Sequence, residues 1–266
     1  MEIISKELSE IRSYIKNGLI EILPEKTLSK FMFASTKMIR SNLALLCFLS
    51  QNCLIEDNFY NILSAGEIIH SASLLHDDVI DDATKRRGST AISEKFSSKI
   101  SILAGDYLLS LAFEKISNLG PNLVNIFEEA SRKMVQAEIK QFFARGTIIP
   151  EEEYINICRG KTAMLFSAIL EACAYILNKD RYKYKKFGEI FGISFQIKND
   201  LDIDSELVDK KNKIYTAREI LGIEKTKQLL DNYKEEMQDL IKDFPENIYK
   251  KALEDLIVSL CTIEKN

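Results

Sequence analysis

The chain has 266 residues, of which 46% are hydrophobic and 29% charged, as is usual for a globular protein with one large or two small domains. Its net charge of −4 argues against a general nucleic-acid-binding protein. Only 10 glycines and 4 prolines interrupt it, so long helices are favoured over a many-turned β architecture.

The five cysteines are scattered and form no CxxC pair. We interpret them as reduced packing residues of a cytoplasmic protein. The N-terminus has no basic segment followed by an apolar core, so we expect no signal peptide. No apolar run reaches about 18 residues, so we expect no membrane span.

Helical patterns follow one another along nearly the whole chain. Apolar residues at steps of three and four over 3–22 predict an amphipathic helix that Pro24 ends. A further helix begins at Asp57 or Asn58 and runs to an acidic segment. The remaining helices are expected over 27–50, 91–118, 122–144, 151–177, 181–203, 215–221, 224–243 and 246–263. No strand pattern or linker is visible, so the sequence predicts one all-α domain over residues 1–266.

Residues 75–88 are the most informative segment, because four carboxylates within six residues follow an uninterrupted apolar run. On a helix, Asp77 and Asp81 lie four residues apart and face the same way. Paired carboxylates of this kind suit Mg²⁺ that is shared with substrate phosphates. Three cations follow and could contact the same phosphates: Lys85, Arg86 and Arg87. The alternative is a solvated acidic helix end with charge-balancing cations.

Other charged residues also stand beside apolar runs. Lys37 and Arg40 lie near the start of a helix and could reach an anion in a pocket, or could be solvated. His70 lies two turns before Asp77 on the same face, although a histidine there can also be a core residue. Lys161 lies inside an apolar helix and needs an anion.

A second acidic cluster, at 199–204, follows another apolar run. Two such clusters at the ends of facing helices would hold several Mg²⁺ ions around a diphosphate. They would leave an apolar shaft between the helices.

Together these segments resemble the trans-polyprenyl diphosphate synthases, the enzymes of head-to-tail isoprenoid chain elongation, over almost the whole chain. The resemblance is carried by Asp77-Asp78-Val79-Ile80-Asp81 with Arg86-Arg87-Gly88, by Ala104-Gly105-Asp106-Tyr107-Leu108, by Glu138-Ile139-Lys140-Gln141, by Lys161-Thr162-Ala163 and by Phe195-Gln196-Ile197. It implies an all-α isoprenoid synthase bundle of about ten or more helices around a central apolar cavity, with Mg²⁺ as cofactor.

The resemblance also implies residue roles. The diphosphate of isopentenyl diphosphate would be bound by Lys37, Arg40, His70 and Arg87. The allylic diphosphate would be bound by Arg86, Lys161, Thr162, Gln196 and Lys213. Metal would be held by Asp77, Asp78 and Asp81, with Asn199 and Asp200 from the second cluster. Asp77, Asp81, Lys161 and Arg86 would assist ionisation of the allylic C–O bond, the step that precedes attack by isopentenyl diphosphate.

The second cluster departs from the family pattern. Asn199 and Ile203 stand where aspartates are expected, and only Asp200 remains in place. A third metal should therefore bind more weakly, unless a local bulge turns Asp200 and Asp204 inward. This leaves open a non-catalytic or partner-dependent subunit of a heteromeric synthase. A class I terpene cyclase is a further alternative, because Asn199-Asp200-Leu201 resembles its motif, but its later Ser or Thr and Glu are missing.

Product length is predicted from side chains above Asp77. In the family, small residues such as Ala72 and Ser73 permit long chains, so we expect a long product such as a quinone side chain. Phe142 or Phe143 could build a deeper floor, or could be ordinary core aromatics. A homodimer is expected from the family, with at most transient membrane contact and no nucleic acid.

Overall fold

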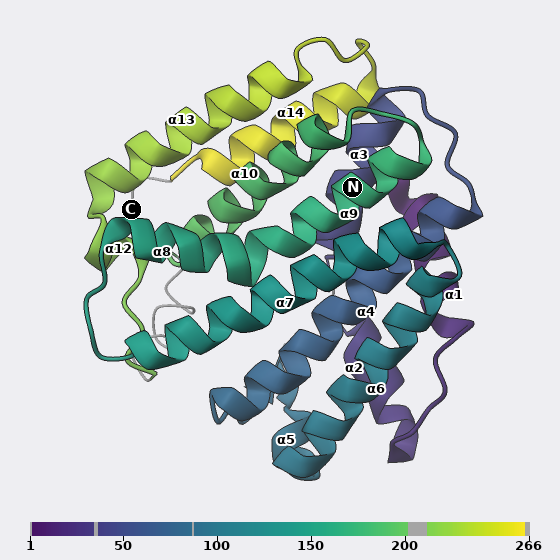
Figure 1. Ribbon diagram of the computed structural model, residues 1–266, viewed down its shortest axis with the longest axis vertical. Coiled ribbons are helices and arrows are strands. Elements are labelled where there is room, and N and C mark those ends of the chain that lie inside the picture. The colour runs from purple at the N-terminus through teal and green to yellow at the C-terminus, as the bar shows by residue number, and fades with distance from the viewer. Residues whose placement is uncertain (1, 35–36, 87, 202–211, 264–266) are drawn as a thin grey trace. The chain divides into compact units, whose positions relative to one another are not determined.

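The structure is a computed structural model that describes residues 2–34, 37–86, 88–201 and 212–263. Its elements are almost all helical (Figure 1). The α-helices are α1 (Ser5–Lys16), α2 (Thr27–Phe33), α3 (Ile39–Ser50), α4 (Asp57–Ile80), α5 (Ile92–Lys95), α6 (Ser98–Ser117), α7 (Pro121–Ala144), α8 (Glu151–Cys158), α9 (Met164–Ile176), α10 (Arg181–Asn199), α12 (Ala217–Ile220), α13 (Ile223–Ile241) and α14 (Ile248–Cys261). Shorter elements are the 3₁₀ turns η1 (Glu2–Ile4) and η2 (Pro24–Lys26), the π-helical segment η3 (Arg159–Ala163), and the strands β1 (Lys85–Arg86) and β2 (Ser89–Thr90).

The chain forms two compact units. The first comprises Met1–Leu45 and Leu54–Val124, and the second comprises Leu46–Cys53 and Asn125–Asn266. The predicted all-α class is confirmed, with more than ten α-helices among the described residues. Within that same part of the chain, no helix is both long and apolar enough to cross a membrane.

In the first unit, α4 and α6 run side by side in close contact (Figure 1). The Ser101 hydroxyl donates a hydrogen bond to the Leu75 carbonyl at 2.8 Å. Gly105 gives the His76 ring its space, because a Cβ there would lie 2.3 Å from Nε2. The packing buries one side of α4 and leaves the side with Asp77 and Asp81 half-buried.

In the second unit, α10 packs against α9 and η3 and also contacts α13 and α14. Two glycines on α10 allow this approach. A Cβ on Gly192 would lie 2.4 Å from the Ala163 Cα, and one on Gly188 would lie 2.8 Å from the Phe166 carbonyl oxygen. Because the backbones come so close, Thr162 on η3 can reach Gln196 on α10.

Several helix boundaries differ from the predictions. The helix predicted over 3–22 ends at Lys16, because Asn17-Gly18 forms the helix terminus although apolar residues continue beyond it. The helix predicted over 27–50 is divided into α2 and α3, since Ala34 is extended and Met38 has a φ of 44°. The helix predicted over 181–203 ends at Asn199.

The sequence analysis also missed the short hairpin. Strands β1 and β2 pair antiparallel, with Lys85 opposite Thr90 and Arg86 opposite Ser89. Gly88, at a φ of 78°, supplies the backbone conformation for the turn. The hairpin places Arg86 close to the end of α4.

Candidate functional site

The first group of predicted site residues lies along one face of α4. His70, Ser73, Asp77 and Asp81 are all half-buried, and Asp81 follows the last helical residue. The Asp81 N–H still donates to the Asp77 carbonyl at 2.9 Å, so the helical spacing is kept to the end. Two accessible carboxylates on one face match the oxygen ligands that Mg²⁺ takes when it also keeps water or phosphate. Within the described residues, no group of three or more His, Cys, Asp or Glu side chains is placed to hold a metal ion. This face therefore fits Mg²⁺ only as a pair of carboxylates whose metal takes its other ligands from water and phosphate.

Asp78, the third predicted metal ligand in this cluster, has a different environment. Its side chain is fully buried. Arg86 Nε donates to Asp78 Oδ1 at 2.6 Å, and Arg86 Nη2 lies 2.5 Å from the same oxygen. A buried carboxylate needs such a partner, because desolvation of an unpaired charge is costly. Asp78 thus has an internal cation, and Arg86 has a protein partner.

The cations near the start of α3 differ in exposure. Lys37 is exposed, whereas Arg40 is only 8% exposed. Beside Arg40, the hydroxyl and N–H of Ser41 donate to the buried Glu67 of α4 at 2.7 and 3.2 Å. The start of α3 is therefore fixed against α4 within the first unit. Arg87, predicted to act with these residues, lies outside the described residues.

The residues predicted to set product length are buried to different degrees. Ala72 is fully buried and Ser73 half-buried, with the Ser73 hydroxyl donating to the His70 carbonyl at 2.8 Å. Phe142 and Phe143 are 49% and 81% exposed and form an edge-to-face pair. Such exposures do not support an apolar floor built by these two aromatics.

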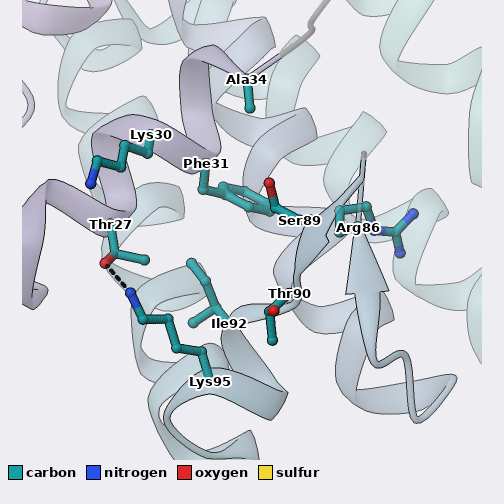
Figure 2. Close-up of a pocket in the computed structure, with 9 residues that line it drawn as sticks. All are labelled: Thr27, Lys30, Phe31, Ala34, Arg86, Ser89, Thr90, Ile92 and Lys95. Atoms are coloured by element: carbon teal, nitrogen blue, oxygen red, sulfur yellow. Dashed lines mark hydrogen bonds between the residues drawn. The ribbon is translucent and has the colours of Figure 1, made fainter.

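Sequence reasoning missed a pocket of about 320 Å³ in the first unit (Figure 2). Phe31 and Ile92 supply apolar walls, while the side chains of Lys30 and Lys95 bring positive charge. Lys95 Nζ lies 3.0 Å from the Glu25 carboxylate and 3.5 Å from the Thr27 hydroxyl. The Arg86 guanidinium points away from the other labelled side chains (Figure 2). Its hydrogen-bond partner is the Asp78 carboxylate described above. The pocket could accept a small anion, but no pattern in the sequence brings these segments together.

In the second unit, Lys161 and Thr162 lie on η3, between α8 and α9. A π-helical turn inserts an extra residue into the helix, and such turns are frequent at functional sites. Lys161 Nζ lies 2.7 Å from Glu138 Oε2 and donates to Gln141 Oε1 at 2.7 Å. The anion that the sequence analysis required for this lysine is therefore present in the protein, on α7.

Asp200 of the second acidic cluster is only 7% exposed. The Tyr154 hydroxyl donates to Asp200 Oδ2 at 2.6 Å, and Gln196 Nε2 donates to Oδ1 at 2.7 Å. Gln196 in turn accepts from the Thr162 hydroxyl at 2.6 Å. Burial raises the pKa of the Asp200 carboxyl, although both hydrogen bonds oppose that shift. Burial likewise raises the pKa of Tyr154 well above its ordinary range.

The other second-unit predictions fall at a helix end and in a loop. Asn199 is half-buried and is the last residue of α10, and Asp204 lies outside the described residues. Lys213 is exposed, has a φ of 57°, and accepts a hydrogen bond from the Gly146 N–H at its carbonyl, at 2.7 Å. With Asp200 buried among the donors Tyr154, Gln196 and the Ala217 N–H, and Asn199 uncharged, these described residues do not fit a metal site.

Three residues with contacts in this unit were not predicted as site residues: Tyr154, Glu138 and Gln141. Glu138 and Gln141 belong to a segment that carries the family resemblance, and this was the available signal. Tyr154 gave no signal, because its partner Asp200 is 46 positions away along the chain.

Comparison with known proteins adds a family and a fold. The family model described as Polyprenyl synthetase matches residues 23–251. Geranylgeranyl diphosphate synthase of Saccharolobus solfataricus is 32% identical over 216 residues, which are 75% of this chain and 63% of that protein. Heptaprenyl diphosphate synthase component 2 of Geobacillus stearothermophilus is 34% identical over 146 residues, 53% of this chain and 46% of that protein.

Among solved structures, a decaprenyl diphosphate synthase from Rhodobacter capsulatus matches with a TM-score of 0.87, covering 98% of this chain and 97% of that chain. At 22% identity this likeness shows the fold. The chain spans about half the length of the curated relatives it matches.

Proposed function

This chain belongs to the polyprenyl synthetase family, and from that premise we propose that it is a prenyltransferase. It joins isopentenyl diphosphate head-to-tail to an allylic prenyl diphosphate and makes an all-trans polyprenyl diphosphate. The observation that carries the proposal is the half-buried face of α4 with Asp77 and Asp81 four residues apart. Because the family match spans segments of both units, we also propose that residues 1–266 function as one domain.

Asp77 and Asp81 are the residues that would hold Mg²⁺. Bound there, the metal would neutralise negative charge on a leaving diphosphate. The backbone of α4 is helical and packed against α6, so the spacing between Asp77 and Asp81 is set before any ligand binds.

Cationic and polar side chains bind the two substrates. Lys37, Arg40 and His70, with Arg87, take the diphosphate of isopentenyl diphosphate. Lys161, Thr162 and Gln196 take the allylic diphosphate, with Arg86 and Lys213. Charge-assisted hydrogen bonds from such donors stabilise a departing diphosphate more than a bound one, since its negative charge increases as the bond breaks.

The reaction then needs no protein nucleophile. The allylic C–O bond breaks, its electron pair leaves with pyrophosphate, and an allylic carbocation remains. The double bond of isopentenyl diphosphate attacks that cation and forms the new C–C bond. The proton lost from the adjacent carbon passes to pyrophosphate, so atoms and charge balance.

We propose a long-chain product, on the small size of Ala72 and Ser73. We also propose a homodimer, because α7 carries a stripe of exposed apolar side chains: Val135, Ile139, Phe142 and Phe143. Five unpaired cysteines suit a reducing compartment, and we take the cytoplasm as the site of action, with transient membrane contact through the product.

The second candidate function is a subunit that needs a partner chain. Two observations favour it: the neutral Asn199, and the engaged carboxylate of Asp200. The matching protein named heptaprenyl diphosphate synthase component 2 is called a component.

A product assay tests the proposal. Purified protein is incubated with Mg²⁺, labelled isopentenyl diphosphate and, separately, geranyl, farnesyl and geranylgeranyl diphosphate, and product length is read by chromatography. Elongated products are expected. Asp77→Ala should lower turnover at least about 100-fold, because charge stabilisation at the leaving group is lost.

Asp82→Asn is the control, since Asp82 is an exposed carboxylate of the same run to which no role is assigned, and Asn adopts its φ of 47° as readily as Asp does. It should retain wild-type turnover. Equal losses in both variants would contradict the assignment to the Asp77 face. No elongation with any primer would contradict the enzyme proposal and favour the partner-dependent subunit.

A further inference from the structure

The carboxylate of Asp200 accepts hydrogen bonds from two side chains and from the backbone N–H of Ala217. Tyr154 on α8 donates to Oδ2, and Gln196, one turn earlier on α10, donates to Oδ1. The group is 7% exposed. A Mg²⁺ ion keeps several waters and needs space for them, which a carboxylate buried between fixed donors does not offer.

The same contacts set the orientation of the Gln196 amide. An ionised carboxylate only accepts hydrogen bonds, so the nitrogen of the amide must face Asp200 and its oxygen must face elsewhere. That oxygen accepts from the Thr162 hydroxyl at 2.6 Å. Asp200 thus aligns both polar groups, and one amide N–H of Gln196 remains outside this network for a ligand.

We propose that Asp200 is a positioning residue and not a metal ligand: it orients the Gln196 amide, which the Thr162 hydroxyl holds from the other side, toward the allylic diphosphate. The inference rests on the function proposed above for Gln196. It also accounts for the neutral Asn199 next to Asp200, because a metal at this point of α10 is not required.

Asp200→Asn is the deciding variant. Asparagine has the same shape, its Oδ1 can still accept from Gln196, and its Nδ2 can donate to the Tyr154 hydroxyl oxygen. It removes the negative charge that a metal ligand supplies. Asp200→Ala, in contrast, removes both acceptors and releases Gln196 and Tyr154.

Two quantities are measured on the full chain. The number of Mn²⁺ ions bound in the presence of inorganic pyrophosphate is counted by electron paramagnetic resonance, with Asp77→Asn as the variant that should lose metal. The Kd of pyrophosphate with Mg²⁺ is measured by calorimetry. We expect an unchanged Mn²⁺ count in both Asp200 variants. We expect pyrophosphate to bind within about threefold of wild type in Asp200→Asn and about tenfold more weakly in Asp200→Ala.

Loss of a bound Mn²⁺ in Asp200→Asn would overturn the proposal. Equal weakening of pyrophosphate binding in Asp200→Asn and Asp200→Ala would also overturn it. If Asp200→Ala does not fold, the variant Tyr154→Phe is measured in its place. It should weaken pyrophosphate binding about threefold with no loss of bound Mn²⁺. A wild-type chain that binds no pyrophosphate also overturns it. If the wild type binds pyrophosphate and Mn²⁺ but elongates no primer, the proposed function fails while the Asp200 result stands.

Discussion

The buried pair of Asp78 and Arg86 is the contact in the first acidic cluster with the largest expected effect on stability. Arg86→Leu would remove the guanidinium that lies 2.5 Å from the fully buried Asp78 carboxylate, which should lower the free energy of unfolding by about 3 kcal/mol. The double variant Asp78→Leu with Arg86→Leu should recover most of that loss, because no uncompensated charge remains. Urea unfolding followed by circular dichroism measures both.

The matched control for this pair is Arg132→Ala. It removes an exposed ion pair with Glu128 on α7, at 3.2 Å, and should leave the free energy of unfolding nearly unchanged. If Arg86→Leu were no more destabilising than Arg132→Ala, the Asp78 carboxylate would not depend on its cation. Arg86 would then contribute mainly to binding the allylic diphosphate and not to stability.

At the scale of elements, the contact between η3 and α10 depends on Gly192. A Cβ at this position would lie 2.4 Å from the Ala163 Cα, and the backbone there cannot give way as a flexible side chain can. Gly192→Ala should therefore lower the free energy of unfolding by about 3 kcal/mol. It should also weaken pyrophosphate binding, since it separates Thr162 from Gln196.

Gly18→Ala is the control for this effect. Its Cβ would meet only the ends of the Lys115 and Leu111 side chains, at 3.2 Å or more, and these can move. Thermal unfolding with and without pyrophosphate compares the two variants. A Gly192→Ala protein with wild-type stability and affinity would show that η3 and α10 can separate without consequence.

Local patterns in the sequence were sufficient for the long elements. Helix α4 and the spacing of Asp77 and Asp81 could be predicted, because a helix places residues four apart on one face whatever surrounds it. The hairpin β1–β2 could not, since strands of two residues have no measurable period. The π turn at η3 was also invisible, because its sequence Arg-Gly-Lys-Thr-Ala carries no apolar period in which one extra residue could be detected.

The polar network in the second unit could not be predicted for a different reason. Tyr154, Thr162 and Asp200 lie on separate elements, and only tertiary packing brings them together. The sequence marked Asp200 as acidic and therefore as a metal ligand. Its burial, from which we infer a positioning role instead, depends on the tertiary packing of α10.

At the scale of the whole molecule, α7 presents an exposed apolar stripe. Val135, Ile139, Phe142 and Phe143 are spaced by four, three and one residues and are between 49% and 81% exposed. Grouped apolar exposure of this kind marks interaction surfaces, whereas single exposed apolar residues do not. A second copy of the chain is the occupant that the proposed homodimer requires.

The stripe gives a prediction about assembly. The double variant Ile139→Asp with Phe143→Asp places two charges in the stripe and should convert a dimer of 30.4 kDa chains to monomers, as measured by light scattering after size exclusion. Val258→Asp changes an exposed apolar residue of α14 that lies ten positions from the other one on that helix, Ile248, and should leave the dimer intact. A double variant that remains dimeric would place the interface elsewhere, and a monomeric wild type would refute the homodimer. Because both changed side chains are already exposed, monomers that keep the wild-type unfolding temperature would show that the charges act on assembly and not on the fold.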